Sequence, residues 1–263
     1  MADILEVQLG QQIALYHHNL CGLYTIAELR PSEDHEVIRI GDSVARGLWE
    51  TSSFSGVASA TCVELALPLE QAEYLGDYVE QLTAFEEGAG VVVCSPYGGR
   101  IHEYTDLQGT RAVEALQDRH AAAASWSCKG YSWRPRSAGA EARWFIPPEE
   151  LSERSFRYLS QVLQSKWWYA VLLMQTPTAD IVIGGSAPPA LKQHMASSIY
   201  SAIGHSCPVT VAAGGPWAAT HPNHLVNRLS EHGGFQIAQP FWVLQNHWCV
   251  IGETIAAVLA EKL

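Results

Sequence analysis

Hydrophobic positions follow two alternating patterns along most of the sequence. Short continuous apolar runs are typical of strands buried on both faces of a sheet, and they occur at 91–94, 168–173, 181–183, 209–212 and 235–237. Between these runs, apolar residues recur at helical spacing, in the segments 68–87, 105–120, 148–165, 189–203 and 250–260. The alternation predicts an α/β fold of three layers, α/β/α, around a mixed central sheet.

Two of the expected helices carry a local start signal. Pro68 stands where the first turn of a helix tolerates proline, and Thr105 and Gln108 have the spacing of a capping box.

Ligands of open α/β sheets bind beyond the carboxyl ends of the strands, so the loops after the strands are the places to look for a site. These loops are 95–106, 174–180, 184–189 and 238–241.

The first sixty residues have a different pattern. Short β-rich pieces at 13–16, 23–29 and 36–40 are separated by turn-prone segments. We therefore predict a small β-rich N-terminal subdomain over residues 1–60, followed by an α/β body over residues 61–263.

Composition and charge narrow the class of partner. The chain of 263 residues is 48% hydrophobic and carries 27 acidic against 16 basic side chains, a formal charge of -11. Nucleic acids and anionic membranes attract clustered Lys and Arg, so we expect neither as a partner. The start of the chain lacks the pattern of a secretion signal, and the six cysteines form no CxxC pair. We expect an intracellular, cytoplasmic protein with reduced thiols.

The loops carry a resemblance to a known family that extends over most of the chain. The matching segments, in order, are LYTIAEL, HEVIRIG, SPYGGRIHEYTDLQ, SWSCKGY, RWFIPPEELSERSF, YAVLLM, DIVIGGSAPPALK, LVNRL and GGFQIAQP. In these segments and their spacing the chain resembles the poly-γ-glutamate hydrolase family. The resemblance implies a zinc-carboxypeptidase-like α/β/α fold, one catalytic zinc held by two histidines and a glutamate, and a glutamate near the C-terminus as general base.

The residues that would carry this chemistry are replaced. In the first block, Tyr97 stands where the family has a histidine ligand, and His102 stands where it has the glutamate ligand. In a later block, Phe145 takes the position of the other histidine. Ala238 occupies the place of the glutamate base, and Met174 that of a further family histidine. The resemblance therefore implies the scaffold without the zinc-binding groups.

Catalytic zinc normally takes three protein ligands from His, Glu, Asp or Cys. Phenylalanine and alanine offer no donor atom, so we expect no metal and no other cofactor at this site. Apolar replacements favour a pocket for a hydrophobic small molecule over one for a polyanionic chain, while an asparagine–arginine pair often used near the substrate carboxylate is retained. The expected substrate-binding residues are Trp144, Phe145, Met174, Asn227, Arg228, Gln236 and Ala238.

Four polar residues after the first strand of the body are the candidates for catalysis: Tyr97, Arg100, His102 and Glu103. A histidine that titrates near neutrality beside a carboxylate suits acid–base work, and a tyrosine hydroxyl suits a hydrogen bond to a ligand carbonyl. Neither a GxSxG elbow nor a cysteine signature points to covalent catalysis.

We therefore expect a metal-independent, non-hydrolytic relative of poly-γ-glutamate hydrolases that binds an apolar small molecule and catalyses its cyclisation or isomerisation in biosynthesis. Such rearrangements can be accelerated by holding a substrate in a reactive shape. An amide or peptide hydrolase of the parent type and a non-catalytic binding protein remain as alternatives. A relocated metal would need new ligands, for which His102, His221 and His224 are the candidates. The oligomeric state stays open.

Overall fold

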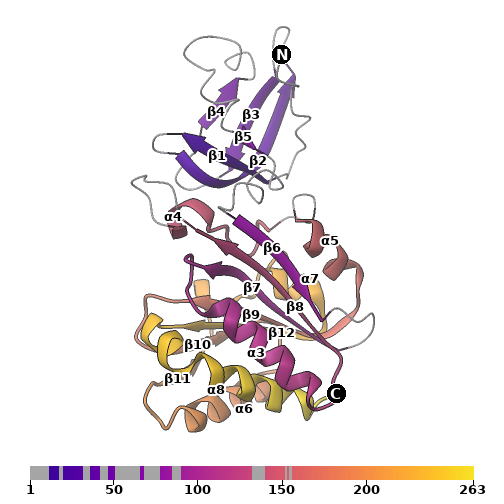
Figure 1. Ribbon diagram of the computed structural model, residues 1–263, viewed down its shortest axis with the longest axis vertical. Coiled ribbons are helices and arrows are strands. Elements are labelled where there is room, and N and C mark those ends of the chain that lie inside the picture. The colour runs from indigo at the N-terminus through magenta and orange to yellow at the C-terminus, as the bar shows by residue number, and fades with distance from the viewer. Residues whose placement is uncertain are drawn as a thin grey trace.

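The computed structural model contains two β-sheets (Figure 1). It describes residues 12–17, 20–31, 36–41, 47–50, 66–67, 78–84, 90–131, 140–151, 153 and 156–263. The smaller sheet is formed within the first 67 residues, and the larger one forms the body of the molecule.

Seven strands make up the sheet of the body. They are β6 (Tyr78–Thr83), β7 (Val91–Gly99), β8 (Ala123–Gly130), β9 (Trp167–Gln175), β10 (Ile181–Gly184), β11 (Val209–Val211) and β12 (Ser230–Gln239). Their order across the sheet is β11-β10-β12-β9-β7-β8-β6. The neighbouring pairs are parallel, except that β10 runs antiparallel to β12 and β6 antiparallel to β8. The sheet is therefore mixed, as the sequence predicts.

Helices cover both faces of this sheet (Figure 1). One layer consists of α3 (Thr105–Gln117), α6 (Pro189–Ala202) and α8 (Phe241–Ala260). The other consists of the shorter helices α4 (Ala140–Trp144), α5 (Arg157–Gln164) and α7 (Leu225–Leu229). The predicted three-layer α/β/α fold is confirmed.

The core is divided between the two faces of the sheet. Along β7, Val91 and Val93 pack with α3, α6 and α8, whereas Val92 and Cys94 pack with α4, α5 and α7. All four side chains are fully buried. A strand buried on both faces needs apolar residues at consecutive positions, which is why this segment has a continuous apolar run.

The smaller sheet has the strand order β4-β3-β2-β1-β5. Its strands are β1 (Gln12–His17), β2 (Leu20–Pro31), β3 (Glu36–Gly41), β4 (Gly47–Glu50) and β5 (Ala66–Leu67). All of its pairs are antiparallel. The three β-rich pieces expected from the sequence lie within β1, β2 and β3, while the boundary between residues 60 and 61 stays a prediction.

Most of the expected elements of the body are found within a few residues of their predicted bounds. This holds for the strands β7, β9, β10, β11 and β12, and for the helices α3 and α6. Helix α8 begins nine residues before the predicted start at Val250. The predicted helix at 148–165 is shorter in the structure, because only Arg157–Gln164 is helical and residues 148–150 form a turn.

The helix predicted over 68–87 is wrong where the structure describes it, because Tyr78–Thr83 forms strand β6. Residues 68–77 and 85–89 lie outside the described part of the chain. Strand β6 pairs antiparallel with β8, and its buried Tyr78 ring packs 5.2 Å from the Trp144 ring. Pairing with an existing strand overrides a helical apolar spacing in so short a segment.

The predicted capping box at the start of α3 is also wrong. Helix α3 has Tyr104 as its N-cap, in the left-handed conformation with φ 74° and without a side-chain cap. The Thr105 hydroxyl donates to the carbonyl of His102 instead. Gln108 exchanges two hydrogen bonds with Gln239 at the end of β12, at 3.0 and 2.7 Å. The Gln108 side chain therefore bonds to a distant amide and does not cap the helix.

A buried carboxylate joins β6 to helix α5. Oε1 of Glu80 accepts hydrogen bonds from the Trp126 indole at 2.8 Å and from the backbone N–H groups of Tyr158 and Leu159, both at 2.9 Å. The two N–H groups belong to the first turn of α5, where donors lack partners within the helix and the helix dipole favours negative charge. Glu80 therefore caps a helix that has no side-chain cap of its own.

We predict that Glu80→Ala lowers the free energy of unfolding by about 2–4 kcal/mol, because three donors lose their acceptor. Urea unfolding followed by circular dichroism measures this loss. Gln81→Ala, at the exposed neighbouring position on β6, is the control and should change stability by at most about 0.5 kcal/mol. Equal losses in the two variants would contradict the capping role.

Candidate functional site

A tight loop after β7 brings Tyr97 and His102 together. The backbone N–H of His102 donates to the carbonyl of Tyr97 at 2.6 Å and closes the loop. Gly99 has φ 70°, in the left-handed region that favours glycine. A Cβ on Gly98 would come within 2.6 Å of the Asp106 side chain. The two glycines of the PYGGR segment are therefore required for this turn.

Helix α4 supplies two more side chains to the same place. The N–H of Phe145 donates to the carbonyl of Glu141 at 3.0 Å, so these residues lie one turn apart on one side of the helix. The Phe145 ring stacks on the Tyr97 ring with 4.8 Å between centroids, and it lies 5.7 Å from the His102 ring. The Tyr97 and His102 rings are 5.0 Å apart. These three rings form one cluster, here called the ring cluster.

The ring cluster joins the three positions at which the resemblance implies zinc ligands. Ligand atoms lie about 2.0–2.2 Å from zinc, so three side chains that share one ion have their centres about 5 Å apart by tetrahedral geometry. The observed separations of 4.8 to 5.7 Å agree with this spacing. The fold thus brings Phe145 to Tyr97 and His102, which lie more than 40 positions before it in the sequence.

The side chains of the ring cluster do not fit a zinc ion. The Tyr97 hydroxyl donates to the carbonyl of Ile146 at 2.7 Å. Nδ1 of His102 accepts the backbone N–H of Gln175 at 3.2 Å, so its lone pair is already used. Phe145 has no donor atom, and Ala238, at the position of the implied base, is fully buried. Only Nε2 of His102 remains, and three protein ligands are needed.

His102 and Glu141 form the polar edge of the ring cluster. Because Nδ1 accepts a hydrogen bond, the neutral imidazole carries its proton on Nε2, which lies 3.8 Å from Oε1 of Glu141. The close contact with the His102 ring lowers the pKa of Glu141 below its ordinary value of 4.5. The His102 side chain is 4% exposed and that of Glu141 66%. A buried donor therefore faces a carboxylate that solvent reaches.

Burial governs the chemistry of Tyr97. Loss of solvent raises the pKa of its hydroxyl well above the ordinary 10.0, and the negative charge of Glu149 adds to this shift. The hydroxyl stays protonated, and it donates a hydrogen bond to the carbonyl of Ile146. The expected hydrogen bond from Tyr97 to a ligand carbonyl is therefore replaced by one to the main chain. In this position Tyr97 holds the segment that follows α4.

Two apolar residues expected at the site lie on neighbouring strands. Met174 of β9 and Ala238 of β12 are directly opposite each other in the parallel register. Both are buried and belong to the same core cluster as Tyr97 and Trp144, and Phe145 packs against that cluster. Met174 and Ala238 therefore lie in the apolar core of this face of the sheet, and the pocket for a hydrophobic ligand stays a prediction.

A second polar group lies around His224, which is 1% exposed. Its Nε2 lies 2.7 Å from Oε1 of Gln236, whose amide nitrogen donates to the carbonyl of Trp217 at 3.4 Å. This orientation of the amide requires the proton on Nε2 of His224. Nδ1 of His224 has no hydrogen-bond partner in the structure. Burial lowers the pKa of His224 below 6.5.

The predicted Asn227–Arg228 pair is engaged within the protein. The Asn227 amide donates to the carbonyls of Ala219 and His221. The Arg228 guanidinium donates to the carbonyl of Leu151 at 2.7 Å and pairs with Glu153. Both residues thus hold loops around α7, and the arginine already has an anionic partner.

The remaining predicted residues lie around the ring cluster or away from it. Arg100 is exposed and Glu103 half-buried, while the Trp144 ring packs on Tyr78. His221 is exposed and its Nδ1 accepts the N–H of Asn223. Among the described residues, no group of three or more His, Cys, Asp or Glu side chains is placed to hold a metal ion. The set His102, His221 and His224 is therefore not brought together as a metal site.

Three residues near the site have no signal in the sequence. Glu141 lies in a segment without a strong periodic pattern, Gln175 acts through its backbone N–H, and Glu149 acts through its charge on Tyr97 and His224. Only the fold of α4 and the end of β9 shows that these groups face the first loop.

The mixed sheet between two helical layers, with a side-chain cluster beyond β7, defines the chain as an α/β/α protein of zinc-carboxypeptidase-like fold. Bacteriophage poly-γ-glutamate hydrolase has a similar structure, with a TM-score of 0.56 at 18% identity over 76% of this chain and 95% of that chain. The zinc-free structure of YNDL is similar at a TM-score of 0.55 and 17% identity, over 74% of this chain and 95% of that chain. Likeness at this level confirms the fold.

Neither a protein-family model nor a curated protein sequence matches the chain. No helix among the described residues is both long and apolar enough to cross a membrane. Of the cysteines whose side chains are described, Cys94, Cys128 and Cys207 are buried and Cys249 is exposed, and all four are free thiols.

We predict that His224 makes the folded chain less stable as the pH is lowered. Its pKa is lower in the folded chain than in the unfolded chain, so the unfolded state binds the proton first and stability is lost as pH falls below 6.5. The loss is at most about 1.4 kcal/mol per pH unit. Urea unfolding between pH 7.5 and 5.0 should show a smaller loss in His224→Gln than in the native protein.

His232→Gln is the matched control, because His232 is exposed. Its pH profile should follow that of the native protein. A His224→Gln profile that is parallel to the native one would refute the assignment.

Proposed function

We propose that the chain is a divergent, metal-independent relative of poly-γ-glutamate hydrolases. The observation that carries this proposal is the ring cluster of Tyr97, His102 and Phe145. These residues stand at the three implied ligand positions. The Tyr97 hydroxyl and Nδ1 of His102 are hydrogen-bonded to the main chain, and Nε2 of His102 lies 3.8 Å from Glu141. The zinc hydrolysis of the parent family needs a coordination shell that these side chains do not supply.

The charges around the ring cluster argue for an uncharged substrate. Glu141 is exposed beside His102, and Glu149 and Glu150 are close enough to raise the pKa of Tyr97. Arg228 already pairs with Glu153. A polyanionic glutamate chain would be repelled by these carboxylates, whereas an apolar small molecule would gain from contact with the half-buried Phe145.

In this proposal, the His102–Glu141 pair performs acid–base chemistry in a rearrangement such as cyclisation or isomerisation. The exposed carboxylate of Glu141 accepts a proton as a bond to hydrogen breaks at one atom of the substrate, and the electron pair of that bond forms the new bond or double bond. An existing π bond of the substrate opens, and its electron pair takes the proton back from Glu141 at another atom. Nε2–H of His102 donates a hydrogen bond to the oxygen on which charge develops. Protons and electrons balance without a metal or a redox partner.

A non-catalytic binding protein is the second candidate. It is favoured by the burial of Tyr97 and His102, which are 1% and 3% exposed. In that case Phe145 and Glu141 would contact the ligand, and the buried rings would only shape the surface. Turnover distinguishes the two candidates.

We predict that the purified native protein contains less than about 0.1 zinc per chain after exposure to equimolar zinc, since Nε2 of His102 and the Glu141 carboxylate are fewer than the three protein ligands that zinc needs. The variant that carries Tyr97→His, His102→Glu and Phe145→His should bind about one zinc per chain. Elemental analysis of both proteins measures the difference.

A double variant with Tyr97→His and Phe145→Leu is the control for nonspecific uptake, because it provides one new ligand only. Stoichiometric zinc in the native protein, together with chelator-sensitive amide hydrolysis, would support the parent hydrolase and overturn the proposal.

We predict that Glu141→Gln and His102→Gln each reduce the turnover of an apolar substrate at least about 100-fold, the usual contribution of a positioned acid or base. Substrates are found by incubating the protein with hydrophobic metabolites and resolving isomeric products by mass spectrometry. Glu114→Gln, on α3 in the opposite helical layer, is the control and should keep full turnover.

Full turnover in both site variants would remove the assigned roles. Ligand binding without any isomeric product would support the binding protein, and products shifted by the mass of one water would support a hydrolase.

A further inference from the structure

The outer face of helices α6 and α8 carries very little charge. Residues 193–252 contain only two Lys, Arg, Asp or Glu residues, Arg228 and Glu231. This stretch includes most of α6, the turn after it and the first half of α8. The chain as a whole has a formal charge of -11. The low density of charge therefore distinguishes this stretch from the rest of the chain.

Aromatic and histidine side chains form a continuous surface on this face, here called the α6–α8 surface. Trp242 and Tyr200 are each 41% exposed. The Trp242 ring lies 6.2 Å from the His247 ring, and Nε2 of His247 lies 3.5 Å from the Ser206 hydroxyl. The His205 ring lies 4.4 Å from Tyr200. This chain of contacts joins the start of α8 to the end of α6.

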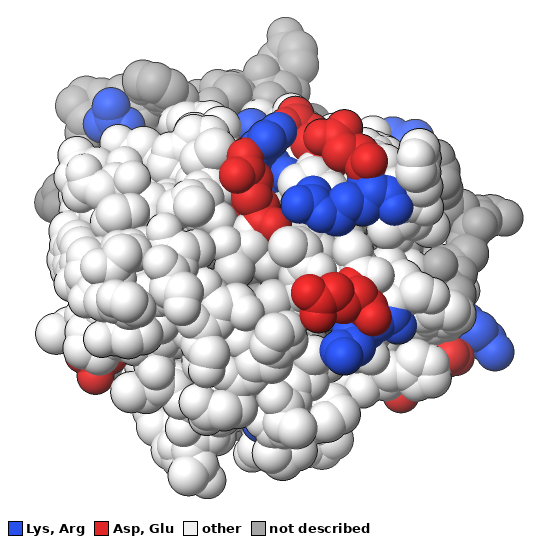
Figure 2. All heavy atoms as spheres, turned by 90° about the horizontal axis from the view of Figure 1, so that it is seen from below, with Lys and Arg blue, Asp and Glu red and all other residues white. Residues whose placement is uncertain are grey.

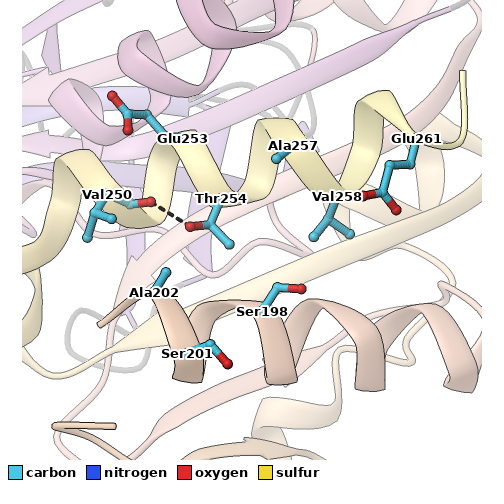
Figure 3. Close-up of a pocket in the computed structure, with 9 residues that line it drawn as sticks. All are labelled: Ser198, Ser201, Ala202, Val250, Glu253, Thr254, Ala257, Val258 and Glu261. Carbon is cyan, nitrogen blue, oxygen red and sulfur yellow. Dashed lines mark hydrogen bonds between the residues drawn. The ribbon is translucent and has the colours of Figure 1, made fainter. Parts of the chain in front are cut away.

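An open groove of about 460 Å³ runs between the two helices (Figure 3). Small side chains line it on both sides: Ser198, Ser201 and Ala202 from α6, and Val250, Thr254 and Ala257 from α8. Small side chains leave room for a protruding side chain from outside. The groove lies in the helical layer opposite the ring cluster, so it is separate from the site described above.

Two glutamates complete the lining of the groove, and each contacts a neighbouring side chain. Glu253 of α8 pairs with Arg111 of α3, which also contacts Glu114 at 3.3 Å. Glu261 lies 3.3 Å from His194 of α6. Figure 2, seen from the side where α6 and α8 lie in Figure 1, shows acidic and basic side chains side by side in small groups, and the larger part of the face carries neither.

We propose that the α6–α8 surface binds a second copy of this chain and forms a two-fold dimer. Two copies with a charge of -11 each repel one another, and an approach through this surface brings together faces that carry few of these charges (Figure 2). The core of a protein interface is typically rich in Tyr and Trp and contains few charged residues, as this surface does.

The size of the surface is compatible with a dimer. The 20 residues of α8 extend about 30 Å, and two neighbouring helices span about 20 Å. The projected area is thus about 600 Å² by the same dimensions, of the order of the roughly 800 Å² that each partner contributes to a stable interface. In a two-fold arrangement the same aromatic residues of one copy lie against the groove of the other.

Sedimentation velocity and light scattering on the full chain, from about 1 to 100 µM, test this proposal over the range in which moderate interfaces form. The expected result is a species with twice the mass of the chain. Tyr200→Glu and Trp242→Glu should each raise the dissociation constant at least about tenfold, because each places a charge in the interface core. Gln161→Glu is the control: it adds the same charge at an exposed position on α5, in the opposite layer, and should leave the dimer intact.

Thermal unfolding of each variant checks that the fold is kept, and Tyr200→Phe should retain the dimer because the ring is preserved. A monomer at every concentration would overturn the proposal and assign the surface to a different partner. A dimer that persists unchanged in both glutamate variants would also overturn it, since the interface would then lie elsewhere.

Discussion

The central strands must be covered on both faces, and the rest of the structure depends on this constraint. Strands β7, β9 and β12 place apolar side chains on each side of the sheet, so a helical layer is needed above and below. The three strands are parallel in the order β12-β9-β7, and their carboxyl ends lie at one edge. The strand ends that carry Tyr97, Gln175 and Gln239 therefore lie at this edge. The Gln108–Gln239 pair ties α3 to the same edge.

At that edge, packed rings occupy the positions at which the resemblance implies zinc ligands. The ring cluster keeps the spacing of three groups around one point, but its polar atoms are bonded to Ile146 and Gln175. A buried phenol with a raised pKa serves to hold the main chain. Chemistry is left to the His102–Glu141 pair, whose carboxylate reaches solvent.

An element can be predicted from the sequence when the interactions that form it are visible in its own segment. Strand β7 is a continuous apolar run because it is buried on both faces, and the same pattern identifies β9 and β10. The edge strand β6 has a mixed pattern, since only alternate residues face the core, and its pairing with β8 is not visible in a local window. Thr105 and Gln108 match a capping box by spacing, yet Gln108 bonds to a residue 131 positions away. Local patterns cannot report such a partner.

The sequence by itself determined the three-layer architecture and the identity of the side chains at the implied ligand positions. These properties depend on the apolar periodicity and on the residue types, both of which can be read along the chain. Only the tertiary structure decided that Tyr97, His102 and Phe145 touch, that Glu141 joins them and that Arg228 is engaged elsewhere. The physical reason is that side-chain contacts depend on the packing of α4 and α7 against the sheet, and helices of five residues are too short to carry a periodic signal of where they pack.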